Sequence, residues 1–224
     1  AVVSQNAHFG IAVDPDVDRL VFVDEKGHFF GEEYTLVACA DYILSKTSGA
    51  TVSNMSSTRA LLDVTLTHAG HYSASAVGEV NVVKEMKAVN AVIGGEGNGG
   101  VIYPPLHYGR DALVGVVIFL SLLVERKVSV SKLRASYPNY FMSKNKIILN
   151  EGIDVDDVMN TMAKRYVSEK ISIIDGVKID FEKEWVHLRK SNTEPIIRVY
   201  TEAMSKEKAS ALAQRFVSEI NSLL

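Results

Sequence analysis

Short apolar runs alternate with amphipathic stretches over the first part of the chain. Runs at residues 9–14 and 20–23 predict two strands joined by an acidic turn. Apolar positions between residues 33 and 46 recur at helical spacing, which predicts a helix that stops before Gly49. The alternation continues with strands predicted at 51–54, 72–77 and 91–94 and helices predicted at 58–69, 80–89 and from Asp111 onward. Strands that alternate with helices predict an α/β domain, in which a mixed, mainly parallel sheet carries helices on both faces.

The pattern changes character around Pro138. A strand is predicted at 146–150, a helix at 154–167, and three or four short strands follow. A closing helix at 205–224 carries its apolar residues along one stripe, which packing against a core explains fully. We therefore predict a linker within residues 134–144 and, after it, a smaller α+β domain with a mainly antiparallel sheet.

Composition and charge narrow the classes of partner. Of the 224 residues 47% are hydrophobic, which is enough to bury real cores. The 24 Lys and Arg against 27 Asp and Glu give a net charge of −3, so nothing indicates a nucleic acid or an anionic membrane as partner. Any anion must therefore be bound at a local site. The most apolar run, residues 112–124, is too short to span a bilayer.

The only cysteine, Cys39, cannot form an internal disulfide, and a single thiol is typical of a reducing compartment. The N-terminus lacks the basic residues and the long apolar core of a signal peptide. We therefore expect a cytoplasmic location. Because the chain opens on Ala1 without a methionine, we also expect it to be a piece of a longer protein.

The sequence DPDVDR at residues 14–19 follows an apolar strand. Its three carboxylates, Asp14, Asp16 and Asp18, alternate along a tight turn, where their repulsion costs stability unless a cation or several donors compensate. Three carboxylate oxygens leave about half of an octahedral shell open, which Mg²⁺ normally fills with water and phosphate oxygens. We predict a Mg²⁺ site, and the alternative is a solvated acidic turn.

Two other protein classes use similar acidic sequences. An EF-hand loop needs glycine where this chain has Arg19 and helices where strands are predicted, although Glu25 does fall on its twelfth position. Phosphatases of the haloacid-dehalogenase type also place an aspartate pair after an apolar strand, but they usually carry Thr or Val where Asp18 stands. A phosphatase with Asp14 as nucleophile remains an alternative.

Residues 185–203 predict a strand, a loop rich in hydrogen-bond donors, and a second strand. Arg189 offers a planar guanidinium that matches phosphate oxygens. Three neutral donors follow in the loop, at Ser191, Asn192 and Thr193. Such a loop can bind a phosphate dianion, and the alternative is an ordinary hairpin whose polar side chains satisfy the turn. Arg198, on the returning strand, is a further phosphate-binding candidate or a partner in a structural ion pair.

A glycine-rich sequence, GGEGNGG, occupies residues 94–100. Its glycines let the backbone approach a ligand closely, and the acid of Glu96 and the amide of Asn98 suit pairs of sugar hydroxyls. Glycine-rich loops are common, so this signal is weak by itself. Asp111, at the start of the next predicted helix, is interpreted as its N-cap.

Together the three motifs resemble those of the α-D-phosphohexomutase superfamily, which contains phosphoglucomutases, phosphomannomutases and phosphoglucosamine mutases. GIAVDPDVDR resembles that family's metal-binding loop, GGEGNGG its sugar-recognition loop and RKSNTEP its phosphate-binding loop, in the family's order. The resemblance implies the end of the second mutase domain at 1–30, the third α/β domain at 31–136 and the C-terminal α+β domain at 137–224.

The resemblance also implies a role for each matching residue. The ligands of Mg²⁺ would be Asp14, Asp16 and Asp18. Arg19 would be the catalytic residue beside the phosphoryl group. The sugar would contact Glu96 and Asn98, and also Val77 and Gly78 in another turn. The phosphate that does not react would be bound by Arg189, Ser191, Asn192, Thr193 and Arg198.

Enzymes of this family transfer a phosphoryl group from a phosphoserine to a phosphosugar and take back the other phosphate of the bisphosphate intermediate. They thereby interconvert 1- and 6-phosphates of hexoses or hexosamines. The family's phosphoserine lies in a first domain that this chain does not contain, so we expect the chain alone to be inactive. Its implied partners are the phosphosugar, the bisphosphate and the missing N-terminal domains.

The chain departs from the family's pattern at three positions. Pro15 and Val17 stand where the family usually has glycine, which stiffens the acidic turn but keeps its three acids. Asn98 replaces a serine of the sugar loop, so an amide stands in place of a hydroxyl and alters the groups offered to a sugar. A non-catalytic module that binds sugar phosphates remains the alternative outside the enzymes.

Overall fold

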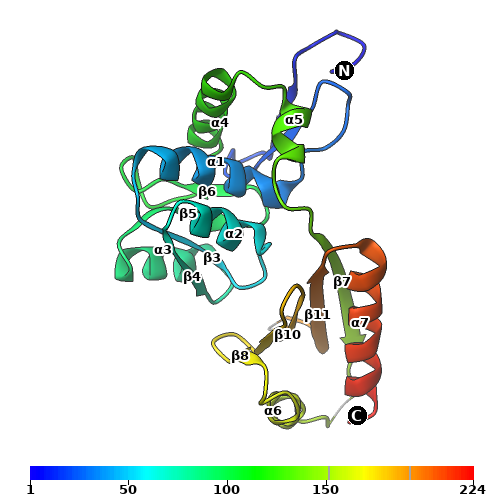
Figure 1. Cartoon of the computed structure of the whole chain (residues 1–224). Helices are drawn as coiled ribbons and strands as arrows, with labels where there is room; N and C mark the ends of the chain where they lie inside the picture. The colour runs from blue at the N-terminus through cyan, green and yellow to red at the C-terminus, as the bar shows by residue number, and fades with distance from the viewer. Residues whose placement is uncertain (151, 192) are drawn as a thin grey trace. The chain divides into compact units, whose positions relative to one another are not determined.

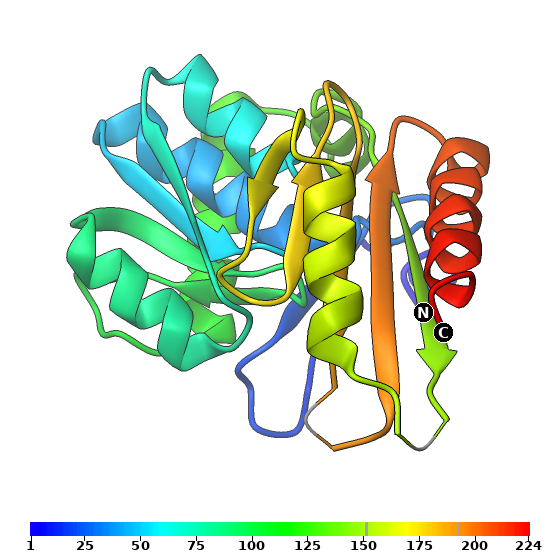
Figure 2. The ribbon, with the colours of Figure 1, turned by 90° about the horizontal axis from the view of Figure 1, so that it is seen from below.

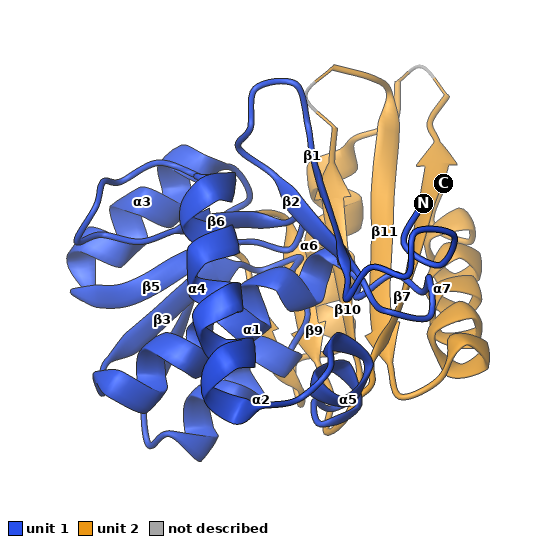
Figure 3. Ribbon diagram, turned by 90° about the horizontal axis from the view of Figure 1, so that it is seen from above, with its two compact units in different colours: residues 1–138 blue, residues 139–224 orange. Residues whose placement is uncertain are grey.

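The computed structural model describes residues 1–150, 152–191 and 193–224. These residues form two compact units, unit 1 at 1–138 and unit 2 at 139–224 (Figures 1 and 3). The three-domain division suggested by the sequence, with boundaries after residues 30 and 136, stays a prediction. Along the described residues, no helix combines the length and apolar character that a membrane span requires.

Unit 1 opens with a two-stranded antiparallel sheet. β1 (Gly10–Val13) pairs with β2 (Leu20–Val23), and Val13 lies opposite Leu20. The six residues between the strands are the acidic sequence DPDVDR, as the sequence predicted. Phe22 of β2 is fully buried, and its ring stacks on that of Phe119 with centroids 3.7 Å apart. This aromatic contact fixes β2 to the body of unit 1 and so anchors one end of the acidic turn.

A four-stranded sheet forms the centre of unit 1. Its order is β4 (His71–Ser75), β3 (Ala50–Asn54), β5 (Ala91–Glu96) and β6 (Gly100–Ile102). β3 runs parallel to β4 and β5, whereas β6 runs antiparallel to β5. The predicted mixed, mainly parallel sheet is confirmed. β6 was not predicted, because its glycine-rich start has no strand pattern. Of the predicted loop at 94–100, residues 94–96 end β5, residue 100 begins β6, and residues 97–99 form the turn of the β5–β6 hairpin.

Helices cover both faces of this sheet (Figure 1). The helices of unit 1 are α1 (Glu32–Lys46), α2 (Ala60–Thr67), α3 (Glu79–Ala88), α4 (Ala112–Arg126) and α5 (Val130–Ala135). On one face Thr51 of β3 bonds to Thr65 of α2. The next residue, Val52, points to the other face and packs with Met86 of α3. Strand alternation thus places α2 and α3 on opposite faces, as predicted.

Asp111 caps helix α4, as interpreted from the sequence. Its Oδ1 accepts a hydrogen bond from the backbone N–H of Val114 at 3.0 Å. Several hydrogen bonds, including one from His107, outweigh the opposing effect of burial, so the pKa of Asp111 is lowered. The charged carboxylate of Asp111 therefore stabilises the N-terminus of α4.

Unit 2 contains a five-stranded antiparallel sheet. Its order is β7 (Phe141–Ile148), β11 (Ile196–Ala203), β10 (Trp185–Lys190), β9 (Val177–Asp180) and β8 (Lys170–Ser172). α6 (Val155–Arg165) and α7 (Lys206–Asn221) pack on one face of the sheet (Figure 2). Met162 and Phe216 of these helices belong to the same hydrophobic core as Leu188 and Ile197 of the sheet. The predicted α+β architecture is confirmed. The predicted linker is wrong over residues 141–144, because β7 pairs with β11 from Phe141 onward.

Glu25 fixes the start of the short helix α5, which was not predicted. Its Oε2 accepts from the backbone N–H of Ser131 at 3.2 Å, and Oε1 accepts from the Ser131 hydroxyl. Partial burial acts to raise the pKa of Glu25, but these hydrogen bonds and others outweigh it and bring the pKa to about 2. A lowered pKa means that the charged form stabilises the fold above the ordinary value near 4.5.

Glu25→Gln is expected to lower the free energy of unfolding at neutral pH by about 1 kcal/mol, the usual effect of losing a helix cap. The difference from wild type should shrink as the pH falls from about 4.5 toward about 2, because the wild-type carboxylate is then protonated. Urea unfolding at several pH values measures both effects. Glu182→Gln, at an exposed position, is the control. Equal stability of the two variants at neutral pH would contradict the capping role.

Candidate functional site

The three predicted metal ligands lie together in the turn between β1 and β2. Asp14, Asp16 and Asp18 each offer a carboxylate oxygen, and these oxygens all lie within 4.8 Å of one another. Val17 has a φ of +58°, a left-handed conformation that is strained for a β-branched residue. This conformation explains why glycine would suit position 17. The turn thus gathers three negative charges in a space that one small cation can share.

Asp14 holds the turn as well as contributing charge. Its Oδ1 accepts from the backbone N–H groups of Asp18 and Arg19 at 3.1 and 3.0 Å, and its Oδ2 accepts from Arg19 Nε at 2.5 Å. Partial burial acts to raise its pKa, but these hydrogen bonds outweigh burial and hold the pKa of Asp14 well below its usual range. Both oxygens of Asp14 therefore fix the conformation of the turn, and the phosphatase alternative with Asp14 as nucleophile stays open.

Asp18 has one oxygen satisfied and one without a hydrogen bond. Its Oδ2 accepts from Nη2 of Arg110, whereas Oδ1 is buried and lacks a hydrogen bond among the described residues, with Nε of Arg19 3.5 Å away as an ion-pair contact. Burial raises the pKa of Asp18 more than the Arg110 charge lowers it. A buried carboxylate oxygen without a hydrogen bond is costly, and a bound cation reduces that cost. The donor set therefore fits a hard divalent cation such as Mg²⁺.

Glu96, at the end of β5, joins three segments of unit 1. Its side chain is almost fully buried; Oε1 accepts from Asn54 Nδ2 at 2.9 Å and from the backbone N–H of Gly78 at 3.2 Å. Oε2 accepts from Nη1 of Arg110 at 2.8 Å. These bonds bring the predicted turn at Val77 and Gly78 next to the glycine-rich loop. The predicted contacts of Glu96, Val77 and Gly78 with a sugar stay predictions.

Asn98 lies at the exposed tip of the β5–β6 hairpin. With Asp14 and Arg19 it lines a pocket of about 290 Å³, whose remaining walls come from β1 and β2. Gly99 makes this approach possible, since its φ is +91° and a Cβ there would lie 2.4 Å from the carbonyl oxygen of Leu20. The Leu20 N–H donates to the Gly99 carbonyl at 3.1 Å. The structure therefore brings the predicted metal loop and the predicted sugar loop to one pocket.

Arg110 connects the same two loops, and no pattern in the sequence singles it out. Its Nη2 donates to Asp18 and its Nη1 to Glu96, while its backbone N–H donates to Glu79 Oε1 at 2.8 Å. A Cβ at Gly100 would lie 2.4 Å from Cδ of Arg110, so the glycine leaves room for this side chain. The one sequence signal is indirect: an arginine that directly precedes a helix cap and directly follows a glycine.

The predicted phosphate loop connects β10 and β11 in unit 2. The Ser191 N–H donates to the Ile196 carbonyl at 3.0 Å, and the hydroxyls of Ser191 and Thr193 lie 3.4 Å apart. Asn192 lies outside the described residues. Arg189 Nε lies 3.0 Å from Oδ2 of Asp175. The loop's two hydroxyls and its arginine therefore come from one hairpin, which suits the binding of an anion.

Arg198 lies directly opposite Arg189 in the β10–β11 register. Within the part of unit 2 that the structure describes, no carboxylate forms an ion pair with Arg198. The structural ion pair considered for Arg198 is therefore not formed among these residues. Its predicted phosphate contact stays a prediction.

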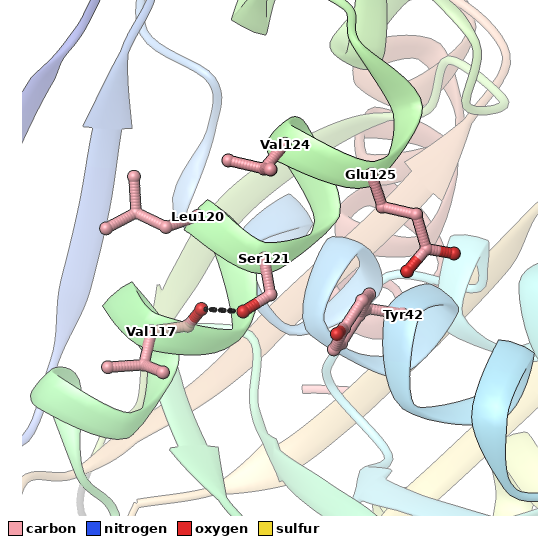
Figure 4. Close-up of a pocket in the computed structure, with 6 residues that line it drawn as sticks. All are labelled: Tyr42, Val117, Leu120, Ser121, Val124 and Glu125. Carbon is pink, nitrogen blue, oxygen red and sulfur yellow. Dashed lines mark hydrogen bonds between the residues drawn. The ribbon is translucent and has the colours of Figure 1, made fainter.

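A larger hollow of about 480 Å³ lies between α1 and α4 (Figure 4). It is lined by Tyr42, Val117, Leu120, Ser121, Val124 and Glu125. Figure 4 shows the Ser121 hydroxyl donating to the Val117 carbonyl of its own helix. Lys46 already binds Glu125 at 2.7 Å, so this hollow offers little to a polar ligand. The smaller pocket beside the acidic turn carries the site chemistry.

Family models match most of the chain. The model for the phosphoglucomutase/phosphomannomutase α/β/α domain III matches residues 31–140, and the model for the phosphoglucomutase/phosphomannomutase C-terminal domain matches residues 145–219. The first of these segments contains the glycine-rich loop. The second contains the hairpin with the Ser191 loop.

Curated relatives match more than nine tenths of the chain. The chain is 35% identical to a phosphoglucomutase/phosphomannomutase from Thermococcus kodakarensis, over 91% of this chain and 45% of the relative. It is 32% identical to a probable phosphoglucosamine mutase from Methanopyrus kandleri, over 95% of this chain and 47% of the relative. The chain thus spans about half the length of the curated relatives it matches.

A crystal structure from Burkholderia thailandensis, described as a phosphoglucomutase/phosphomannomutase family protein, shares the fold. The TM-score is 0.83 at 23% identity, and the match covers 99% of this chain and 48% of that one. The observed strand order and helix placement are therefore those of a known architecture.

Proposed function

The chain belongs to the α-D-phosphohexomutase superfamily as a C-terminal part, and from this premise we propose that the whole protein interconverts hexose or hexosamine 1-phosphates and 6-phosphates. The relatives are named mutases, which are isomerases that move a phosphoryl group. We further propose that the reaction depends on Mg²⁺ and passes through a phosphoserine and a sugar bisphosphate. The phosphoserine would lie in a part of the protein that this chain does not include.

The observation that carries the proposal is the pocket shared by Asp14, Arg19 and Asn98. The three acids of the turn would hold Mg²⁺, which when bound neutralises charge on phosphoryl oxygens. The Arg19 side chain is half exposed and held at Nε by Asp14, so its terminal nitrogens would be available to a phosphoryl group. Asn98 offers an amide to sugar hydroxyls at the same pocket.

Unit 2 would bind the phosphate that does not react. Ser191 and Thr193 offer hydroxyls, and Arg189 and Arg198 offer charge on neighbouring strands. Two distinct phosphate sites suit a mutase, because both phosphates of a bisphosphate must be positioned while the sugar reverses its orientation.

A cytoplasmic location is proposed because a single buried cysteine is typical of reducing compartments.

The test is an activity assay on the full-length protein, with glucose, mannose and glucosamine 1-phosphates as substrates. Formation of the 6-phosphate, abolished by EDTA, is expected. Release of inorganic phosphate without isomerisation would favour the phosphatase alternative. Binding of a phosphosugar without turnover would favour a non-catalytic module. The 224-residue chain alone is expected to bind but not to turn over substrate.

Arg189→Ala is expected to weaken phosphosugar binding by about 1.5–3 kcal/mol, the range for hydrogen bonds to charged groups. The KM of the full-length protein should rise at least about tenfold, whereas the control Arg215→Ala, which removes an exposed pair with Glu219, should change it little. Steady-state kinetics measures both. An unchanged KM in Arg189→Ala would show that Arg189 does not bind the phosphate and serves only in its ion pair with Asp175.

A further inference from the structure

Three basic residues stand side by side across three neighbouring strands of unit 2. In the antiparallel register Arg189 of β10 lies opposite Arg198 of β11, and Arg198 lies opposite Lys146 of β7. β11 is the middle strand of the three. Directly opposed residues have side chains on the same face, about 5 Å apart at Cβ. Lys146, Arg198 and Arg189 therefore form one row, which we call the basic row.

The basic row lies on the face of the sheet that α6 and α7 do not cover. The residues next to it along each strand, Ile147, Ile197 and Leu188, belong to the core that faces the two helices. Because side chains alternate along a strand, the three basic residues point the other way. Lys146 is exposed, and the arginines are half buried. Arg189 lies two residues before Ser191, so the basic row is close to the loop that carries Ser191 and Thr193.

Nearby carboxylates neutralise only part of the positive charge of the basic row. Asp175 pairs with Arg189, but no other carboxylate of the described residues forms an ion pair with the row. Like charges that face each other across strands destabilise a sheet. An anion bound beside the three aligned charges and the neighbouring hydroxyls would reduce this repulsion and so stabilise the fold.

We propose that Lys146 is a further phosphate-binding residue, the third cation of a site formed with Arg189, Arg198 and the hydroxyls of Ser191 and Thr193. The inference deepens the proposed function and rests on it. The ligand is the dianion of a phosphate monoester, since two charges of the row remain after Asp175 neutralises one. Lys146 binds this dianion through its ammonium charge, from β7, which neighbours the β10–β11 hairpin.

The experiment compares two lysines of the same strand. Lys144 is exposed and lies two residues before Lys146 on the same face, but its neighbour in the register is Tyr200. Affinity of the 224-residue chain for glucose 6-phosphate and for inorganic phosphate is measured by calorimetric titration. Lys146→Gln is expected to weaken both about fivefold at low salt, and Lys144→Gln less than about twofold. Lys146→Arg should restore the affinity.

Thermal unfolding separates ligand binding from a purely structural role. Without ligand, Lys146→Gln should leave the melting temperature unchanged or raise it, since it removes a like charge beside Arg198. With saturating glucose 6-phosphate, the stabilisation should be smaller than in wild type. Equal affinities of the Lys146→Gln and Lys144→Gln chains, with Arg189→Ala still weakening binding, would overturn the role of Lys146 alone. Absence of binding by the wild-type chain would overturn the phosphate site itself.

Discussion

Replacing Arg110 by alanine is expected to lower the free energy of unfolding by about 3 kcal/mol, the low end for removing one partner of a buried ion pair. The substitution leaves two carboxylates, on Asp18 and Glu96, without their shared cation. Both are largely withdrawn from water, with side chains 18% and 6% exposed. Glu79 adds a third carboxylate nearby, at 3.6 Å from Nε of Arg110. Like charges then face each other in a poorly solvated space.

Urea unfolding of the chain measures this loss. Lys46→Ala is the control in the same unit, because it removes an exposed pair with Glu125 and should cost less than about 1 kcal/mol. Adding Glu96→Gln to Arg110→Ala should recover part of the stability, since one uncompensated charge is then removed. Arg110→Lys should fall between wild type and alanine, because one ammonium keeps the charge but lacks the planar fork that reaches both acids. A loss no larger than that of the control would show that the three acids do not depend on Arg110.

The parts of the fold that follow from local patterns could be predicted. Apolar periodicity marked the strand at residues 20–23 and the helix beginning near residue 33, because burial of one face is what fixes each element. The acidic turn was predictable for a different reason. Its three carboxylates lie within five residues, so the local sequence alone brings them close together and no tertiary contact is needed.

The parts that depend on distant contacts could not be predicted. Arg110 meets Asp18 across 92 positions, and no periodic pattern records such a partner. β6 forms because Gly100 pairs with Glu96, although glycine has little tendency to form strands. The basic row is likewise set by register, since Lys146 and Arg198 face each other only when two strands align. Sequence motifs thus located the loops, while the contacts that hold the loops in place came from the fold.

Asp16→Asn is expected to weaken binding of a divalent cation by at least about tenfold, because it removes one of three charged ligands. Asp16 is the best acid to change. It is exposed, whereas Asp14 holds the turn through Arg19 and Asp18 is bound to Arg110. The variant should therefore fold as wild type does, and its loss of affinity reports on the cation site alone. Asp157→Asn, at another exposed acid, is the matched control.

The measurement is titration of the 224-residue chain with Mn²⁺, followed by the loss of the free ion's paramagnetic resonance signal, and competition by Mg²⁺ identifies the same site. Wild type and Asp157→Asn should bind one ion with equal affinity. Binding should also raise the melting temperature of wild type but hardly that of Asp16→Asn, since a ligand stabilises only a fold that binds it. If wild type and Asp16→Asn bind Mn²⁺ equally, or if neither binds it, the acidic turn is a solvated loop. The ion-pair contact with Nε of Arg19, at 3.5 Å, would then be what compensates the buried Oδ1 of Asp18.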